Sequence, residues 1–140
     1  MNRIRYYFLV LTSLLALSVL GQDNIAIGQW RTHLPYQKVI DVEVFGNKVF
    51  AATPYELFYF DKEDNSINIM NKISGLSDVG ISTIRYNKEQ DLLFVAYTNT
   101  NVDLIDRQGK VTNMSDIKKK NIMGNKCINN VTFAGHLAYV

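Results

Sequence analysis

The feature of this 140-residue chain that most restricts its fold is a pattern of four short β-type runs that occurs twice. Two residue pairs set the spacing: Thr53 with Thr98 (98 − 53 = 45) and Asp61 with Asp106 (106 − 61 = 45). Polar turns separate the runs, which predicts strands joined by hairpins. The predicted strands cover 38–45, 49–53, 57–60, 67–72, 81–86, 93–98, 102–105 and 111–114, and a third copy opens at 128–133, with 135–140 echoing 46–51 at an offset of 135 − 46 = 89.

Four short strands repeated about every 40–50 residues are typical of propeller blades. A single blade has two apolar faces and cannot bury both alone, so neighbouring blades stack around an axis. The continuous apolar runs 49–52 and 93–96 fit strands that are covered on both faces, and their alanines suit close approach near the axis. The sequence therefore predicts an all-β fold, a β-propeller of four-stranded antiparallel blades, with about two and a half blades in residues 39–140.

The predicted blade count has a consequence for the length of the protein. Propellers close with roughly four to eight blades, whereas two and a half leave apolar faces and a strand edge uncovered. We therefore expect the propeller to be truncated here and to continue beyond residue 140 in a longer protein. We also expect residues 22–140 expressed alone to aggregate.

The N-terminus has the pattern of a cleavable signal peptide. Arg3 and Arg5 precede an uncharged apolar run over 6–20, which is 20 − 6 + 1 = 15 residues long. A membrane-spanning helix needs about 20 residues, so the run is short for an anchor and matches a signal-peptide core. We predict a signal peptide over 1–21, with an uncleaved anchor as the alternative, and a segment over 22–38 that leads into blade one. The mature chain is then exported and has no transmembrane span.

The remaining composition points away from catalysis, cofactors and nucleic acid. The net charge is +2 with both signs interspersed, and Lys118–Lys120 is expected to be a solvated turn, with an anionic partner as the alternative. His33 and His136 lack further ligands at metal-binding spacing, and 61–66 lacks the glycine of a calcium loop, which favours a hairpin turn. Cys127 is expected to pack as a small core side chain. No nucleophile elbow or phosphate loop is present, so the sequence predicts no metal, no cofactor and no enzyme.

Five aromatic or imidazole side chains are candidates for contacts with a partner or a glycan. Trp30 and Tyr36 could anchor a partner or pack the N-terminal segment onto blade one, and His33 could bond within that segment. Tyr55 and Tyr97 lie near predicted loops, where an aromatic ring could stack on a sugar.

The repeat resembles the two-component-regulator type of propeller. In those repeats a Gly-Leu-Ser turn precedes an Ile-x-x-Ile strand and a Leu-Trp-Ile-Gly-Thr-like strand, and here Gly75-Leu76-Ser77, Ile81, Ile84 and 93–96 stand at matching places. Phe94 replaces the usual tryptophan, and the intervening turn is one residue longer. This resemblance implies one possible function, the periplasmic ligand-sensing propeller of a hybrid two-component regulator that binds an oligosaccharide.

The segment Ile27-Gly-Gln-Trp-Arg-Thr-His-Leu-Pro-Tyr36 resembles the start of the mature PorZ family, the propeller-containing component of the type IX secretion system. The resemblance implies a non-catalytic scaffold at the outer membrane or cell surface. It further implies a complex with PorU, PorV and PorQ that processes secreted cargo and attaches it to surface lipopolysaccharide. The family's second propeller and C-terminal signal domain do not lie in these 140 residues. A third class, a propeller lyase or glycosidase, would need catalytic residues from further blades.

Overall fold

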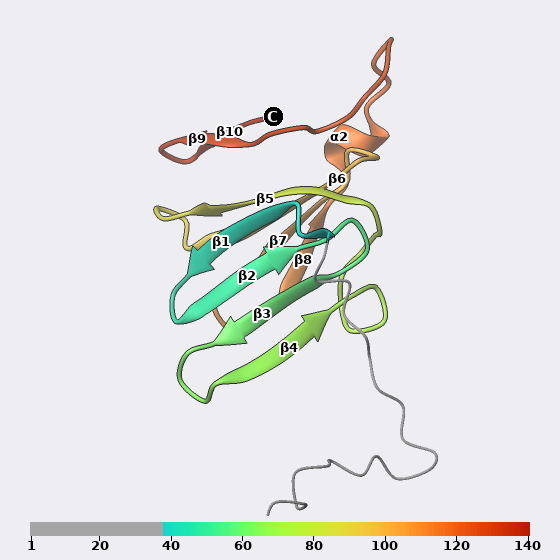
Figure 1. The fold of residues 1–140 in the computed structure, drawn as a ribbon. Helices are drawn as coiled ribbons and strands as arrows, with labels where there is room; N and C mark the ends of the chain where they lie inside the picture. The colour runs from blue at the N-terminus through green and yellow to red at the C-terminus, as the bar shows by residue number, and fades with distance from the viewer. Residues whose placement is uncertain (1–37) are drawn as a thin grey trace, which may run out of the picture. The chain divides into compact units, whose positions relative to one another are not determined.

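A computed structural model describes residues 38–140, which belong to one compact unit (Figure 1). Two antiparallel four-stranded sheets follow one another along the chain, each in sequential strand order, and a two-stranded sheet comes after them. Blade one comprises β1 (Asp41–Phe45), β2 (Lys48–Ala52), β3 (Leu57–Asp61) and β4 (Ser66–Met70). Blade two comprises β5 (Ile81–Asn87), β6 (Leu92–Tyr97), β7 (Val102–Ile105) and β8 (Val111–Met114), and is followed by the short helix α2 (Asp116–Lys119) and by β9 (Thr132–Ala134) and β10 (Leu137–Tyr139). The predicted four-stranded blades are confirmed.

The turns between strands follow the polar residues that predicted them. Gly46 and Gly135 open the β1–β2 and β9–β10 turns with φ of 60° each, a conformation that glycine adopts without a Cβ clash. These two turns lie at the predicted offset of 89 residues. The β3–β4 turn begins at Asp61, whose carboxylate accepts a hydrogen bond from the Glu63 amide at 3.0 Å. Residues 61–66 therefore form the predicted hairpin turn.

The repeat is less regular than its sequence suggests. The strand registers pair Ala52 with Leu57 in blade one and Ala96 with Val102 in blade two. The offset between the blades is therefore 96 − 52 = 44 before the connection and 102 − 57 = 45 after it. The β6–β7 connection is one residue longer than the β2–β3 connection.

This extra residue corrects one of the two predicted anchors. Thr98 lies within the longer connection, and the residue at the position of Thr53 is Tyr97 (97 − 53 = 44), so the predicted pairing of the two threonines is wrong. Asp61, the last residue of β3, and Asp106, the residue directly after β7, do occupy equivalent positions, at the predicted offset of 45.

Strand β6 is covered on both faces, as its continuous apolar run predicts. Leu93, Val95 and Tyr97 pack with side chains of blade one, whereas Phe94 and Ala96 pack with the residues that follow blade two. Because neighbouring side chains on a strand point to opposite faces, this alternation places β6 between two apolar layers. The Phe94 and Phe133 rings meet edge to face, with centroids 4.8 Å apart. Each blade face is therefore a contact surface for the next blade.

The inner strands of the two blades are also held by a charged contact. The Asp41 carboxylate accepts hydrogen bonds from Thr83 Oγ1 at 2.6 Å, from the Ile84 amide at 3.1 Å and from Arg85 Nη1 at 2.7 Å. Burial alone would raise the pKa of Asp41, but the hydrogen bonds from Thr83 and Arg85 hold it below its ordinary value. The Glu43 carboxylate lies 3.5 Å from the same Arg85 nitrogen. This contact fixes β1 against β5.

The start of the third copy differs from its prediction. Ile128 and Val131 are buried, yet only Thr132–Ala134 forms a strand, so β9 begins four residues later than expected. Cys127 is exposed, and its predicted place in the core is wrong because the buried position is that of its neighbour Ile128. No helix within residues 38–140 is long and apolar enough to cross a membrane.

Candidate functional site

The connections between strands fall at two opposite ends of the blades, because successive strands in an antiparallel sheet run in opposite directions. We call these the turn end and the crossover end (on the left and right of Figure 1, respectively). The turn end consists of residues 46–47, 62–65, 88–91, 106–110 and 135–136, and the crossover end of residues 53–56, 71–80, 98–101 and 115–131. Any surface that binds a partner through blade loops must lie at one of these ends.

A cleft of about 350 Å³ lies at the turn end between blade one and blade two. Its floor is aromatic: Phe45 and Phe50 are buried, and Tyr59 is half-buried. Its rim is polar and comes from both blades. The lining residues are Phe45, Gly46, Asn47, Lys48, Phe50, Tyr59, Asp61, Glu63, Asp106, Arg107, Gln108 and Gly109.

The polar groups of this cleft are largely engaged with one another. Lys48 Nζ lies 4.8 Å from the centre of the Tyr59 ring and 4.0 Å from Asp61 Oδ2. The Asn47 amide donates to the Glu63 carboxylate. Because Lys48 already covers the Tyr59 ring, the cleft offers no open aromatic platform for stacking a sugar.

One wall of the cleft includes Arg107, which is held by two polar side chains outside the lining. Arg107 pairs with the Asp91 carboxylate, which accepts a hydrogen bond from the Tyr86 hydroxyl at 2.7 Å. The hydrogen bonds from Tyr86 and Arg107 lower the pKa of Asp91, and the bond to Asp91 raises the pKa of Tyr86. The Tyr86 ring packs on Phe45 with centroids 4.7 Å apart. These contacts join the β5–β6 and β7–β8 turns to blade one.

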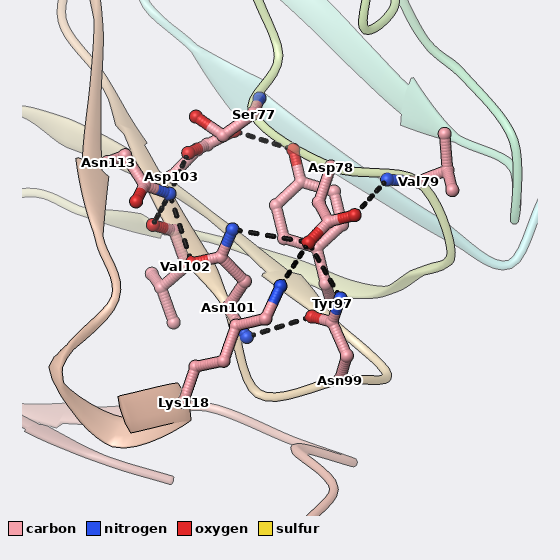
Figure 2. Close-up of polar contacts among 10 residues, drawn as sticks. All are labelled: Ser77, Asp78, Val79, Tyr97, Asn99, Asn101, Val102, Asp103, Asn113 and Lys118. Atoms are coloured by element: carbon pink, nitrogen blue, oxygen red, sulfur yellow. Dashed lines mark hydrogen bonds and ion pairs between the residues drawn. The ribbon is translucent and has the colours of Figure 1, made fainter. Parts of the chain in front are cut away.

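The crossover end contains a buried carboxylate that forms no ion pair with any residue of 38–140. Asp103 is fully buried and accepts hydrogen bonds from the Tyr97 hydroxyl at 2.6 Å, the Ser77 amide at 2.7 Å and Asn113 Nδ2 at 2.8 Å (Figure 2). A buried ionised carboxylate is tolerated when several donors satisfy it. Burial and the bond to Asp103 raise the pKa of Tyr97 far above its ordinary value. This group ties the β4–β5 crossover to three strands of blade two.

A second carboxylate at this end joins two crossovers. Asp78 accepts hydrogen bonds from Lys118 Nζ at 2.7 Å and from Asn99 Nδ2 at 2.6 Å (Figure 2). Burial would raise the pKa of Asp78, but the contacts with Lys118 and Asn99 lower it well below its ordinary value. The β4–β5 crossover, the β6–β7 connection and α2 are thereby held together.

Crossover residues also meet through their backbones. The Pro54 carbonyl accepts hydrogen bonds from the amides of Gly80 and Ile81 at 3.0 and 3.1 Å, and the Thr98 amide donates to Gly80 O at 2.8 Å. Gly80 has φ of +82°, and a Cβ there would lie 2.8 Å from Thr98 Oγ1, so the approach requires glycine. Beside this contact, Tyr55 extends into solvent and is 63% exposed.

The structure separates the five candidate contact residues. Tyr55 is exposed at the crossover end, so it stays a candidate for contact with a partner or a glycan. The prediction for Tyr97 is wrong: its ring is fully buried towards blade one, and its hydroxyl is used by Asp103. Trp30, His33 and Tyr36 lie outside the described residues, and their roles stay predictions. Among residues 38–140, no three His, Cys, Asp or Glu side chains are grouped closely enough to hold a metal ion.

Sequence reasoning missed the groups that fix the crossover end and the cleft wall. Asp103 stands inside the apolar run of β7, and a carboxylate at such a position is a signal that donors surround it. Arg107 and Asp91 lie in turns rich in other charges, and nothing in their spacing distinguishes them. The ion pair of Lys118 with Asp78 was not predictable, because nothing in the sequence distinguishes Lys118 from Lys119 and Lys120.

Comparison with known proteins also identifies a β-propeller. The family model described as the N-terminal β-propeller domain of PorZ, of the type IX secretion system, matches residues 49–140, which is 140 − 49 + 1 = 92 of 140 residues. A search of curated proteins gave no match.

Two solved structures share this fold. PorZ of Porphyromonas gingivalis, described as an essential bacterial surface component of the type IX secretion system, is 32% identical, with a TM-score of 0.66 over 73% of this chain and 14% of that one. The extracellular domain of a putative one-component system from B. thetaiotaomicron is 16% identical, with a TM-score of 0.56 over 74% of this chain and 14% of that one. This chain thus spans about one seventh of the length of the structures it matches. The resemblance noted in the sequence is confirmed, and the chain belongs to the family of PorZ N-terminal β-propeller domains of the type IX secretion system.

Proposed function

We propose that this chain is part of a non-catalytic, exported scaffold of the type IX secretion system. It acts in the outer-membrane complex that processes secreted cargo and attaches it to surface lipopolysaccharide, with partners of the PorU, PorV and PorQ type. The observation that carries the proposal is the family match over 49–140. The predicted signal peptide over 1–21 is part of this proposal, because the partners lie outside the cytoplasm.

The chemistry of the described residues supports a scaffold. One ion pair holds the loops at each end: Arg107 pairs with Asp91 at the turn end, and Lys118 pairs with Asp78 at the crossover end. Such groups fix the positions of loops, as a binding scaffold requires, since rigid loops lose less entropy on binding. Asp103 is likewise saturated by donors from its own blade and crossover.

The proposal is tested in the source bacterium with the full-length gene. A tagged full-length protein should co-purify with PorU-, PorV- and PorQ-type proteins from the outer membrane. Deletion of the gene should leave secreted cargo unprocessed and without lipopolysaccharide, and the wild-type gene should restore both. Intact cargo attachment in the deletion strain would contradict the proposal.

The reading frame provides an independent check. A second propeller and a C-terminal sorting domain downstream of residue 140 would agree with the proposal. A transmembrane helix followed by a histidine kinase would instead support the alternative predicted from the repeat, a ligand-sensing propeller of a two-component regulator.

A further inference from the structure

Exposed apolar side chains are unequally divided between the two loop ends. The turn-end connections contain no large apolar residue at all within the described part of the chain. At the crossover end, the side chains of Ile73, after β4, and Met123, after α2, are fully or almost fully exposed, at 97% and 103%. The exposed large apolar residues of the crossover end are Tyr55, Ile73, Val79, Ile122 and Met123. The two ends of the blades therefore present different chemistry to solvent.

The connection that follows blade two presents Met123 on a braced loop. Residues 118–125 are exposed without interruption, and the loop projects beyond α2 (Figure 1). At its base, Lys126 Nζ donates to Lys118 O at 3.0 Å and to Lys120 O at 2.7 Å, which ties the two arms together. The Lys118 side chain is in turn bonded to Asp78 (Figure 2). Two lysines thus hold the loop, while its tip exposes an apolar side chain.

The charge beside the tip is positive. The connection 115–131 contains four lysines and one aspartate, which gives 4 − 1 = +3. Lys118 is neutralised by Asp78, whereas Lys119 and Lys120 enter no ion pair with the rest of residues 38–140. A braced apolar tip between unpaired cations fits a partner that presents an apolar side chain beside carboxylates.

We propose that the loop 118–126 is a docking site for a protein partner of the secretion complex, whose matching segment is acidic and carries an apolar anchor for Met123. This inference rests on the proposed function, because it names a contact through which the scaffold holds a partner. The same end of the blades carries the carboxylates of Glu56 and Asp116, and Asp116 is exposed on α2 beside the loop. Carboxylates are repelled by an anionic lipid surface, so the mixed charge favours a protein over a membrane.

The test uses the full-length protein in its own membrane, with matched charge changes at the two loop ends. The double variant K119E/K120E alters the proposed site, and K62E/K88E makes the same change at exposed turn-end lysines. We expect K119E/K120E to lower co-purification of PorU-, PorV- or PorQ-type proteins about fivefold, and Met123→Asp about tenfold. K62E/K88E should retain wild-type recovery. Equal recovery from all variants overturns the inference while leaving the proposed function intact.

Photo-crosslinking identifies the class of the partner and does not depend on stability. Met123→p-benzoylphenylalanine should crosslink to one of those secretion-system proteins, while Lys62→p-benzoylphenylalanine should not. A crosslink from position 123 to lipopolysaccharide or phospholipid, to another domain of the same chain, or to nothing overturns the inference. If the wild-type protein retrieves no secretion-system protein at all, the proposed function fails, and the inference fails with it.

Discussion

We call the face of a blade that points away from the next blade along the chain its front face. The front faces of blades one and two are built from the same strand positions but differ in burial. The strand registers place Val42 of β1 at the position of Ile84 of β5 (42 + 42 = 84) and of Val131 before β9 (42 + 89 = 131). Val42 is 53% exposed, whereas Ile84 is 0% and Val131 is 3% exposed. An apolar blade face thus depends on the blade before it for its burial.

Blade one's front face is apolar at every position. It carries Val42, Val44, Val49, Ala51, Phe58, Phe60, Ile67 and Ile69, four of which are large side chains more than a third exposed. A face of this kind on a soluble protein marks a contact surface. The predicted continuation of the propeller would supply a blade that covers it, as blade one covers blade two.

The front face of blade two also has a polar component that is absent from the front face of blade one within residues 38–140. At the position equivalent to Asp103 in blade two, blade one has Phe58 (103 − 58 = 45). Asp103 and its donors Tyr97 and Ser77 therefore occur at only one of these two faces. Apolar area provides the general attraction between blades, and the buried carboxylate fixes the crossover of one particular pair.

The largest effect is expected from placing a charge on the covered face. Ile84→Asp buries an unpaired carboxylate between the blades and should destabilise the protein by more than about 4 kcal/mol. The control Ile84→Val should cost only about 1 kcal/mol. Urea unfolding of both variants measures the difference. A small loss for Ile84→Asp would mean that the blades do not pack as described.

The next largest effect concerns the polar component. Asp103→Ala leaves the Tyr97 hydroxyl and the Ser77 amide without their acceptor and should cost about 3 kcal/mol. Tyr97→Phe should cost about 1 kcal/mol. In the double variant the two losses should not add, because Tyr97→Phe removes one of the donors that Asp103→Ala leaves unpaired. Additive losses would show that the two groups act independently.

A smaller effect should appear in the pH dependence of the contact between β1 and β5. The pKa of Asp41 is lower in the folded protein than in the unfolded chain, so its contribution is present above about pH 4 and is lost as the pH falls through the folded pKa. Asp41→Asn should cost about 1–2 kcal/mol at pH 7 and should flatten the acid limb of a stability–pH curve. The curve comes from urea unfolding at a series of pH values.

Glu43 beside Asp41 provides a control of opposite sign. Burial raises the pKa of Glu43 despite the nearby Arg85, so its contribution to stability falls as the pH rises through that raised pKa. The variant Glu43→Gln cannot ionise, so it should not show the loss of stability that the wild type shows as the pH rises towards neutral. If both variants changed the curve in the same direction, the two carboxylates would not differ as described.

The sequence predicted the blades well because strand alternation and turn chemistry are local. Gly46 and Asp61 mark their turns by themselves, and the run 93–96 shows that both faces of β6 are covered. The roles of Tyr97 and Asp103 were not predictable in this way, because one inserted residue in the β6–β7 connection changes which positions correspond. The braced loop at Met123 depends on contacts between residues as far apart as Asp78 and Lys118, which no local pattern records.

The smallest effect is expected at the front face of blade one, and it tests the comparison directly. In the chain of 140 residues, Val42→Asp places a carboxylate where the side chain is already half exposed, so the free energy of unfolding should change by less than about 0.5 kcal/mol. The soluble fraction on expression should rise, because the charge interrupts an exposed apolar face. In a longer protein that contains the predicted further blades, the same substitution should instead cost as much as Ile84→Asp, since a covering blade would bury the carboxylate. A small cost in both chains would show that no blade covers the front face of blade one. The two front faces would then be similar in sequence but not in burial.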